Sequence, residues 1–399
     1  MLKKYLYGRK LNKFPIFLFS ALLAIFVIFP FSCKTKEEIG GASEQEDPDL
    51  EQTSVLEKWE LIQPPQIGSV WRLRAVAFAS ENLGWAVGYD SDSTKGVVLR
   101  YYNGKLENVF MPYAGKQWTV HLSDIALTGQ DSGWVVGDKY YIWSDPDRFK
   151  PFGLRLNNGK WMVVPMPSPN AQSADLAAVA AVPGASEVFA VGGANSKMIR
   201  QGLIMKYAGN WSIVPNPSIR SNWWELKDVA FTVGGTGWAV GRAVHPSEDE
   251  NALIVLVYKN GNWYQEKVPM VKGIKKGLLA VCAVSPNMAW AGGSGVLLKY
   301  TDGIWQKENF SPDIENWTIR SIHFSDPQNG WAVGWDEVNK KPLWLKYSAG
   351  NWQRVLTKWD EKIEELNEIF FLNPSFGLAV GGVSFKGTSP GALFIYMEH

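Results

Sequence analysis

The 399-residue sequence contains little cysteine, little histidine and almost no excess of charge. Its two cysteines are Cys33 and Cys282, and because Cys33 lies in an N-terminal export segment, no intramolecular disulfide framework is available. Cys282 stands in the apolar stretch LLAVCAV, where we expect a small buried side chain. The formal net charge is +1, so the basic excess that nucleic-acid binding requires is missing.

Sequence motifs for catalysis and for metal binding are also missing. The four histidines, which are far apart and show no metal-ligand spacing, are His121, His245, His323 and His399. No GxSxG motif, no Cys–His pairing and no phosphate-binding loop occurs. Asp145 and Asp147, in the stretch SDPD, have two interpretations, a turn or a calcium site, and a turn is the commoner use. We therefore expect no enzymatic activity, no metal and no cofactor.

Only one long hydrophobic run is present, and it lies near the N-terminus. Residues 1–13 carry five basic side chains and no acid, and the apolar run PIFLFSALLAIFVIFPFSC follows at 15–33. This order is typical of an export signal, and the run is also long enough for a retained membrane anchor. Its end, FPFSC, resembles a bacterial lipobox with Cys33 as the lipidated residue, although Pro30 stands where leucine is usual. Both interpretations place the protein in the cell envelope, outside the cytoplasm and attached to a membrane.

The next segment, residues 34–54, is rich in acidic residues. It contains no aromatic side chain and only two large aliphatic ones. Such a segment buries too little apolar surface to offset the entropy lost on ordering. The sequence therefore predicts a disordered tether over 34–54 and a folded domain over 55–399.

An internal repeat dominates the folded domain. The phrase GWAVG or a variant of it recurs seven times, at spacings of 41 to 55 residues. Its central position is occupied in turn by Trp85, Trp134, Phe189, Trp238, Trp290, Trp331 and Leu378. A period near fifty is typical of one blade of a β-propeller.

Each repeat divides into four short segments that alternate apolar and polar residues. An apolar segment such as LRAVAF (73–78) precedes the phrase, and a segment such as LIMKY (203–207) follows it. A Gly-containing turn then leads to a fourth segment that opens with tryptophan, or with Leu106 in the first repeat. Four such strands predict one antiparallel blade, so we expect an all-β, seven-bladed β-propeller. The last repeat lacks its fourth segment, whereas WELIQPP (59–65) precedes the first, so the N-terminal strand should complete the last blade.

The repeated phrase and its DG-x-W turn resemble the propellers of the photosystem II assembly and stability factors, and the related sialidase-type Asp-box (BNR) repeats. The resemblance covers residues 59–399 and implies the architecture. The Asp-box pattern S-x-D-x-G-x-T-W is degraded, since only TDGIW (301–305) keeps the aspartate and no copy keeps the threonine. The arginine-rich patch of the photosystem factors has no run of arginines to match here.

Candidate binding residues gather on one predicted face, where the second-to-third strand loops and the links between blades lie. The turns between first and second strands are short and similar, whereas the second-to-third loops range from two residues to the long DKYYIWSDPDRFKPFG (138–153). We call this side the variable-loop face, and its loops are the expected place for function. The candidates are Trp143 and Arg148 in the longest loop, the linker tryptophans Trp71, Trp118, Trp224 and Trp317, and the basic residues Arg74, Lys227 and Arg320.

The linker tryptophans and the basic residues each have a second interpretation. Three of the tryptophans recur in one pattern, W-x-[LI]-x-x-[VI]-x-F, which indicates packing between blades as readily as contact with a sugar or a peptide. The basic residues follow those three tryptophans by three positions, near the mouth of the predicted channel, where they either meet an anion or stay solvated.

We expect a membrane-tethered, monomeric scaffold that binds a protein or a glycan and does not bind nucleic acid. The alternatives are an assembly factor for a membrane complex and a glycan-active enzyme.

Overall fold

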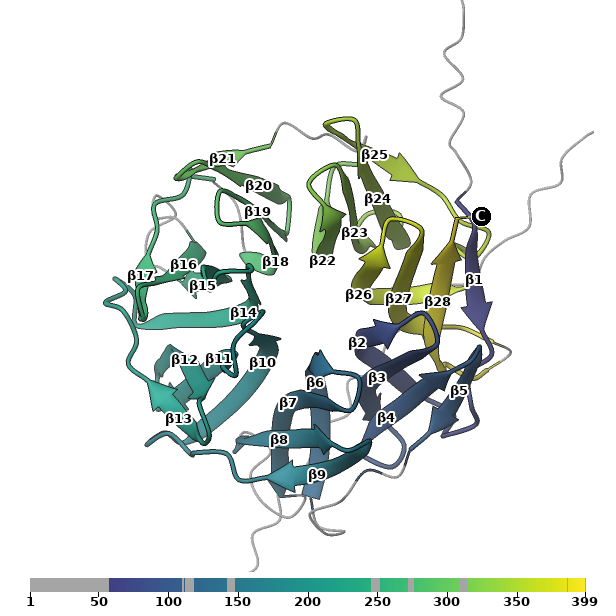
Figure 1. Cartoon of the computed structure of the whole chain (residues 1–399), viewed down its shortest axis with the longest axis horizontal. Coiled ribbons are helices and arrows are strands. Elements are labelled where there is room, and N and C mark those ends of the chain that lie inside the picture. The colour runs from purple at the N-terminus through teal and green to yellow at the C-terminus, as the bar shows by residue number, and fades with distance from the viewer. Residues whose placement is uncertain are drawn as a thin grey trace, which may run out of the picture. The chain divides into compact units, whose positions relative to one another are not determined.

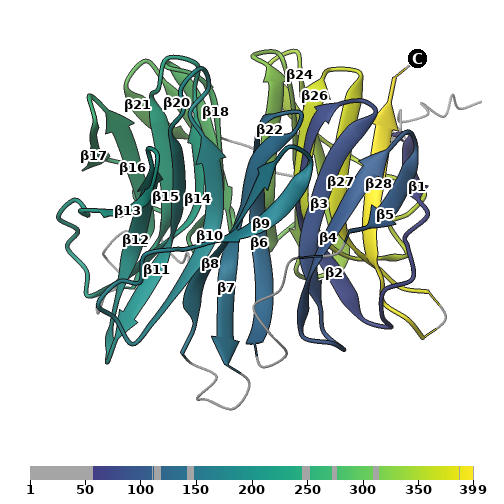
Figure 2. The ribbon, with the colours of Figure 1, turned by 60° about the horizontal axis from the view of Figure 1, so that its bottom comes forward.

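The structure is a computed structural model, and it describes residues 57–109, 111, 118–141, 148–244, 252–271, 276–308, 314–385 and 387–398. These residues contain twenty-eight β-strands. They form seven four-stranded antiparallel blades arranged in a ring around a central channel (Figures 1 and 2). The predicted fold class and blade number are therefore confirmed. The predicted signal peptide, Cys33 and the tether lie outside the described residues. Within those residues, no helix is long and apolar enough to cross a bilayer.

In blades 1 to 6 the strands follow the chain from the channel outward. Blade 1 contains β2 (Trp71–Ser80), β3 (Leu83–Asp90), β4 (Lys95–Tyr102) and β5 (Lys105–Asn108). Blade 2 contains β6 (Trp118–Gly129), β7 (Ser132–Tyr141), β8 (Lys150–Asn157) and β9 (Lys160–Val164). Blade 3 contains β10 (Ser173–Ala181), β11 (Val188–Ser196), β12 (Ile199–Tyr207) and β13 (Trp211–Val214). Blade 4 contains β14 (Trp223–Phe231), β15 (Gly237–Val244), β16 (Leu253–Lys259) and β17 (Asn262–Gln265).

The remaining blades have the same order. Blade 5 contains β18 (Leu278–Ser285), β19 (Met288–Gly293), β20 (Val296–Thr301) and β21 (Ile304–Lys307). Blade 6 contains β22 (Trp317–Asp326), β23 (Asn329–Asp336), β24 (Lys341–Ser348) and β25 (Asn351–Val355). Blade 7 contains β26 (Ile363–Asn373), β27 (Phe376–Val383), β28 (Gly391–Met397) and, as its outer strand, β1 (Trp59–Ile62).

The N-terminal strand closes the ring as the sequence predicts. Strand β1 pairs antiparallel with β28, and Trp59 lies opposite Tyr396. The Trp59 side chain is fully buried, and its ring centroid lies 4.8 Å from that of Trp344 and 5.6 Å from that of Trp331. The indole nitrogen of Trp359 also donates a 2.8 Å hydrogen bond to the carbonyl oxygen of Trp59. Large aromatic area is thus buried by a strand of only four residues.

Aromatic pairs join neighbouring blades at six of the seven junctions. In each pair the aromatic residue of the repeated phrase meets, edge to face, the tryptophan of the fourth strand of the next blade. The ring centroids lie 5.2–6.4 Å apart and the interplanar angles are 83–89°. The pairs are Trp85–Trp161, Trp134–Trp211, Phe189–Trp263, Trp238–Trp305, Trp290–Trp352 and Trp331–Trp59.

The seventh junction, between blades 7 and 1, uses leucine on both sides. Leu378 replaces the aromatic residue of the phrase, Leu106 replaces the fourth-strand tryptophan, and both belong to one apolar cluster. The two exceptions to the repeat therefore belong to one contact, in which both large rings are absent together.

A β-bulge in the innermost strand of every blade explains the second glycine of the phrase. In β2 the register shifts between Leu73 and Ala75, and Gly88 lies opposite Leu73. A Cβ atom on Gly88 would lie 1.9 Å from the carbonyl oxygen of Arg72, closer than any atom can approach. Gly241 faces the bulge of β14 in the same way. The phrase recurs because each bulge admits only glycine opposite it.

Candidate functional site

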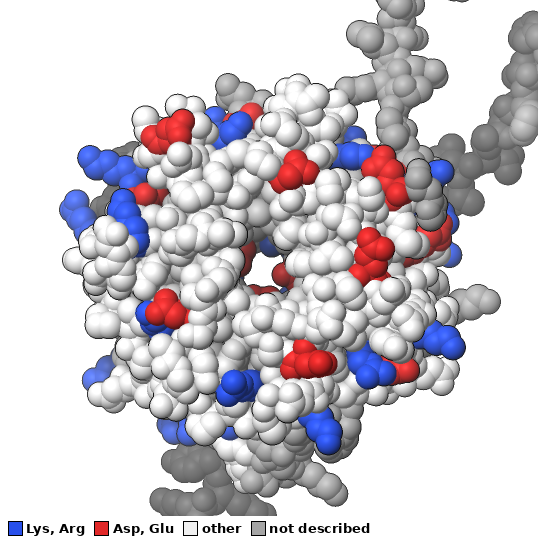
Figure 3. Space-filling model, viewed as in Figure 1, with Lys and Arg blue, Asp and Glu red and all other residues white. Residues whose placement is uncertain are grey.

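The residue that each bulge inserts lies at the central channel. The bulge residues, which we call the bulge ring, are Arg74, Ser123, Ala177, Lys227, Leu279, Arg320 and Asn367. All of them line a cavity of about 100 Å³ on the ring axis. Figure 3 shows this axis as an open hole with acidic side chains visible inside it.

The three basic residues predicted to share one phase are all members of the bulge ring, but their surroundings differ. The Lys227 ammonium lies 2.9 Å from a carboxylate oxygen of Glu225. The Arg320 guanidinium donates a 2.9 Å hydrogen bond to the side-chain oxygen of Asn367. Arg74 is exposed and lies over the ring of Tyr89, 5.3 Å from its centroid, with no ion pair to any described residue. Of the three, Arg74 is the one that presents an unneutralised charge.

One position after the bulge, half-buried acids connect neighbouring blades. The Asp124 carboxylate accepts hydrogen bonds of 2.7 Å from the backbone N–H of Ile125 in its own blade and from that of Val179 in blade 3. Asp228 makes the same two contacts, with Val229 in its own blade and Val281 in blade 5. A backbone N–H freed by a bulge is satisfied in this way, because a buried donor without a partner is costly.

A third acid makes a contact of this kind between blades 7 and 1. The Glu368 carboxylate of blade 7 accepts a 2.5 Å hydrogen bond from the backbone N–H of Val76 in blade 1. Burial raises the pKa of Asp124 to about 7 and, together with the charge of Asp124, raises the pKa of Asp228 to about 8. Burial likewise raises the pKa of Glu368, and the charges of the other two acids add to the effect. These three carboxyls therefore favour the protonated form near neutral pH.

A larger hollow of about 460 Å³ opens beside the channel across blades 1 to 4. It lies on the variable-loop face, because its residues come from the beginnings of the innermost strands and from the ends of β3 and β7. The residues that line it are Arg74, Tyr89, His121, Leu122, Ser123, Asp138, Asp175, Leu176, Ala177 and Lys227. We call this hollow the channel mouth.

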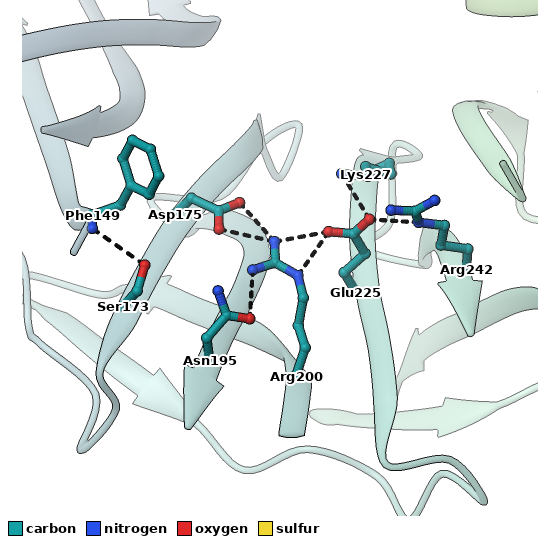
Figure 4. Close-up of polar contacts among 8 residues, drawn as sticks. All are labelled: Phe149, Ser173, Asp175, Asn195, Arg200, Glu225, Lys227 and Arg242. Atoms are coloured by element: carbon teal, nitrogen blue, oxygen red, sulfur yellow. Dashed lines mark hydrogen bonds and ion pairs between the residues drawn. The ribbon is translucent and has the colours of Figure 1, made fainter. Parts of the chain in front are cut away.

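An ion-pair network fixes one wall of the channel mouth between blades 3 and 4 (Figure 4). The buried Glu225 carboxylate accepts hydrogen bonds from Nε of Arg200 at 2.8 Å and from Nε of Arg242 at 2.7 Å. Arg200 reaches across to Asp175, 2.8 Å away, and its backbone pairs with Trp223 in the next blade. A planar guanidinium bound to two carboxylates holds the two blades in register at this rim.

The charges of the network set the ionisation of its acids. Burial alone would raise the pKa of Glu225, but the neighbouring Lys227 and Arg200 outweigh it, so the pKa is lowered. For Asp175, burial is stronger than the effect of Arg200, so its pKa is raised. Glu225 is thus a fixed anion that neutralises part of the local positive charge, and the wall keeps its shape.

The opposite wall of the channel mouth is aromatic. The His121 ring lies 5.5 Å from the Tyr89 ring and 5.7 Å from the Tyr140 ring, measured between centroids. Nδ1 of His121 also lies 3.4 Å from a carboxylate oxygen of Asp138. Phe149 extends this wall by an edge-to-face contact with Tyr140 at 5.2 Å. The hollow therefore has a charged side and an aromatic side.

The linker tryptophans are mostly buried. Trp71 and Trp224 are 1% and 2% exposed, and each ring covers a glycine of the preceding blade, Gly391 and Gly202 respectively. Trp317 is also buried, at 8% exposure. These rings pack between blades, as the packing interpretation expects, and offer little surface to a ligand.

Two other candidates come from blade 2. Trp118 is half-buried. It precedes the bulge residue of its strand by five positions, whereas Trp71 precedes its own by three, so Trp118 is out of phase with the other three tryptophans. Arg148 is exposed on the variable-loop face, and Trp143 lies outside the described residues.

Sequence reasoning missed the acids behind the bulge, although a signal was present. LSDIAL, LKDVAF and LNEIFF place an acid at the same position of an otherwise apolar strand in three repeats. An acid in such a strand indicates a buried carboxylate with backbone partners. The Arg200 network has no comparable signal, because its members come from four strands of two blades.

Comparison with solved structures supports the fold. YCF48 bound to a D1 peptide matches with 15% sequence identity and a TM-score of 0.56, over 87% of this chain and 100% of that chain. YCF48 from Cyanidioschyzon merolae matches with 17% identity and a TM-score of 0.54, over 85% and 98% of the two chains. The polysaccharide lyase Uly1 matches with 10% identity and a TM-score of 0.51, over 84% and 91%. No protein-family model and no curated protein matches the sequence.

These likenesses establish the architecture. The chain has the fold of the YCF48 propellers, which confirms the predicted resemblance to the photosystem II assembly factors in fold. At 10–17% identity they do not extend to a ligand or a reaction.

Proposed function

We propose that this protein is an exported, membrane-tethered scaffold that binds a protein partner at the channel mouth. One observation carries the proposal: Arg74, which forms no ion pair with any described residue, presents its guanidinium at the edge of a hollow of about 460 Å³ that lies between an aromatic and a charged wall. A hollow with aromatic surface and one free cation suits a peptide that carries an acidic group. The basic and apolar N-terminal segments with Cys33 support attachment to a membrane.

The YCF48 complex supports a protein partner over a glycan. That propeller, of the same fold, binds a D1 peptide. A narrower role, as an assembly factor for a membrane complex, follows if the partner is a subunit of such a complex. Loss of one complex on native gels after deletion of the gene would support the narrower role.

The test compares Arg74→Ala with Arg100→Ala in capture of partners from the native envelope. Arg100 lies in the same blade but is paired with Glu107 at 2.9 Å and is remote from the channel mouth. We expect wild type and Arg100→Ala to recover the same protein, and Arg74→Ala to bind it about thirtyfold more weakly, since an arginine contact buried in an interface contributes about 2 kcal/mol. Equal recovery by all three proteins, or recovery of nothing by wild type, would contradict the proposal.

A second function, action on a glycan, is favoured by one arrangement at the same hollow. His121 and Asp138 lie 3.4 Å apart, beside Tyr89 and Arg74, and a His–Asp pair is the usual form of a general base. The purified protein should then degrade a polyanionic polysaccharide, and His121→Ala should abolish the turnover. A complete lack of turnover on a polysaccharide panel would leave binding as the function.

A further inference from the structure

Three blades place charged residues opposite each other at one register position near the variable-loop face. In blade 1, Asp90 of β3 pairs with Lys95 of β4, and in blade 6, Asp336 of β23 pairs with Lys341 of β24. In blade 2 the corresponding pair consists of two lysines, Lys139 of β7 and Lys150 of β8. These three positions correspond because Asp90, Lys139 and Asp336 pair with equivalent residues of the innermost strands. Their partners are Trp71, Val120 and Trp317, and each partner lies two residues before the Leu or Ile that precedes the bulge.

The aspartates of blades 1 and 6 are structural. Asp90 and Asp336 are 5% and 0% exposed. Asp90 accepts a hydrogen bond from the Asp92 backbone, and Asp336 accepts hydrogen bonds from the Val338 and Asn339 backbones, so each caps a short loop. In blade 2 the loop between the paired strands is longer, and a cation replaces the capping carboxylate.

No carboxylate of the described residues forms an ion pair with either lysine of blade 2. The Lys139 ammonium lies instead over two rings, 5.0 Å from the centroid of Trp118 and 5.6 Å from that of Phe152. Burial, and then the charge of Lys150, lowers the pKa of Lys139. Like charges placed directly opposite each other on neighbouring strands destabilise a sheet, so this pair costs stability in the free protein.

Both lysines line a cavity of about 350 Å³. Apart from the lysines and Ser168, its lining is apolar, and Val163 at its edge is 40% exposed. The apolar lining residues are Pro151, Phe152, Val163, Val164, Pro165 and Met166. The cavity thus combines a double positive charge with an apolar wall, and its volume suits one or two amino-acid side chains.

We propose that this cavity, the blade 2 pocket, binds an acidic residue of a partner peptide together with an adjacent apolar residue. The carboxylate lies between Lys139 and Lys150, and the apolar side chain packs on the exposed Val163 and Pro165. The inference rests on the proposed function, because it assigns the partner's chemistry to the same face. It adds a second contact point that does not include Arg74 or any other residue of the channel mouth.

The test measures binding of a dye-labelled peptide, acetyl-Gly-Leu-Asp-Phe-Gly-amide, and of its asparagine counterpart, by fluorescence anisotropy. We expect the aspartate peptide to bind wild type about tenfold more tightly than the asparagine peptide, which corresponds to one favourable charge contact. Lys139→Met and Lys150→Met should each weaken binding of the aspartate peptide by about tenfold and leave its asparagine counterpart unaffected. Lys341→Met is the matched control, since the same register position in blade 6 faces Asp336.

Lys139→Asp gives the sharpest result. It restores the Asp–Lys pair of blades 1 and 6, so the variant should fold with an unchanged or higher melting temperature and lose binding of the aspartate peptide altogether. Equal binding of both peptides, normal binding by Lys139→Met, an equal loss in Lys341→Met, or no binding by wild type at millimolar peptide would each overturn the proposal.

Arg74→Ala separates the two hypotheses. This variant should bind the aspartate peptide as wild type does, because the blade 2 pocket does not include Arg74. If the pocket variants bind normally while Arg74→Ala still loses the envelope partner, the proposed function stands and the pocket assignment is wrong.

Discussion

The junctions between blades and the lining of the channel arise from the same repeat, but they vary differently around the ring. At six junctions an aromatic residue of the repeated phrase meets a fourth-strand tryptophan, and at the seventh both are replaced by leucine. In the bulge ring, by contrast, seven positions carry six different residue types, and only arginine occurs twice.

The difference separates packing from recognition within one molecule. A junction residue must fit its partner in the next blade, so it is constant or changes together with that partner. A bulge residue lines the channel, where its partner differs from blade to blade, so the backbone holds its position while leaving its chemistry free. Positions whose backbone the repeat fixes, but whose residue type it leaves variable, are therefore the best candidates for function in a propeller.

The junction that β1 completes should give the largest effect. Removal of residues 55–65 leaves the outer edge of β28 unpaired and removes the buried Trp59 from four aromatic contacts. Trp59→Ala alone should cost about 3–5 kcal/mol of unfolding free energy. The deletion should cost more and lower the melting temperature by several degrees or more.

Differential scanning calorimetry measures both variants against Glu60→Ala, a change on the same strand at an exposed side chain. This control should shift stability by less than about 0.5 kcal/mol. A deletion variant that melts with the wild type would show that the closing strand adds nothing to the ring.

Exchange should destabilise both kinds of junction, the tryptophan junction by leaving a cavity and the leucine junction by overpacking. Trp290→Leu and Trp352→Leu should each cost about 2–4 kcal/mol, and the double variant less than their sum, because the edge-to-face contact is lost only once. Leu378→Trp should cost about 1–3 kcal/mol by overpacking, since Phe78 and Phe376 already occupy that cluster. Chemical denaturation measures the four variants. A stabilising Leu378→Trp would mean that the leucine junction is underpacked and not a matched alternative.

The channel acids should give the smallest change, visible only as a dependence on pH. Asp228 has a pKa of about 8 in the folded protein, against about 4 in an unfolded chain. Between pH 4 and pH 8 the folded state binds more protons than the unfolded state. The contribution of Asp228 to the unfolding free energy is therefore greatest below about pH 4 and is lost as the pH rises toward 8. Asp228→Asn cannot ionise, so between pH 5 and pH 9 the difference in unfolding free energy between this variant and wild type should shift in favour of the variant by about 1–3 kcal/mol.

Asp326→Asn serves as the control for this titration. Burial of Asp326 is outweighed by hydrogen bonds from Asn329 and Gln328, so its pKa is lowered and it stays ionised over the whole range. The control should therefore differ from wild type by a constant amount from pH 5 to pH 9. A constant difference for Asp228→Asn as well would show that channel water keeps this carboxylate ionised.

The blades and their closure could be predicted from the sequence because both leave periodic marks. Alternating apolar residues identify the strands, the Gly-containing turns separate them, and the missing fourth segment of the last repeat identifies β1 as its completion. The pattern W-x-[LI]-x-x-[VI]-x-F also indicates the bulge. Two residues separate its second and third apolar positions, where a regular strand would have one. The pattern does not say which way the extra residue points.

The candidate site was harder to predict, because its members meet only through the ring. Arg74, Lys227 and Arg320 share a phase that the repeat reveals, and the structure places all three at the channel. Their different partners, an aromatic ring, a carboxylate and an amide, come from distant strands and leave no local signal. Trp71 and Trp224 resemble ligand-binding residues in the sequence, but glycines of the preceding blade create the spaces that bury them.

The closing strand also dictates the order in which the ring forms. Strand β1 is synthesised before the other strands but is the last to pair, since 331 residues separate Ile62 from its partner Leu393. At about 5–20 residues per second, the ribosome needs roughly 17–66 s to make that partner. Until then Trp59 lacks its cross-strand neighbour Tyr396 and β1 is an unpaired edge. A chain interrupted anywhere before β28 can therefore fold blades but never a ring, so closure itself distinguishes finished molecules from truncated ones.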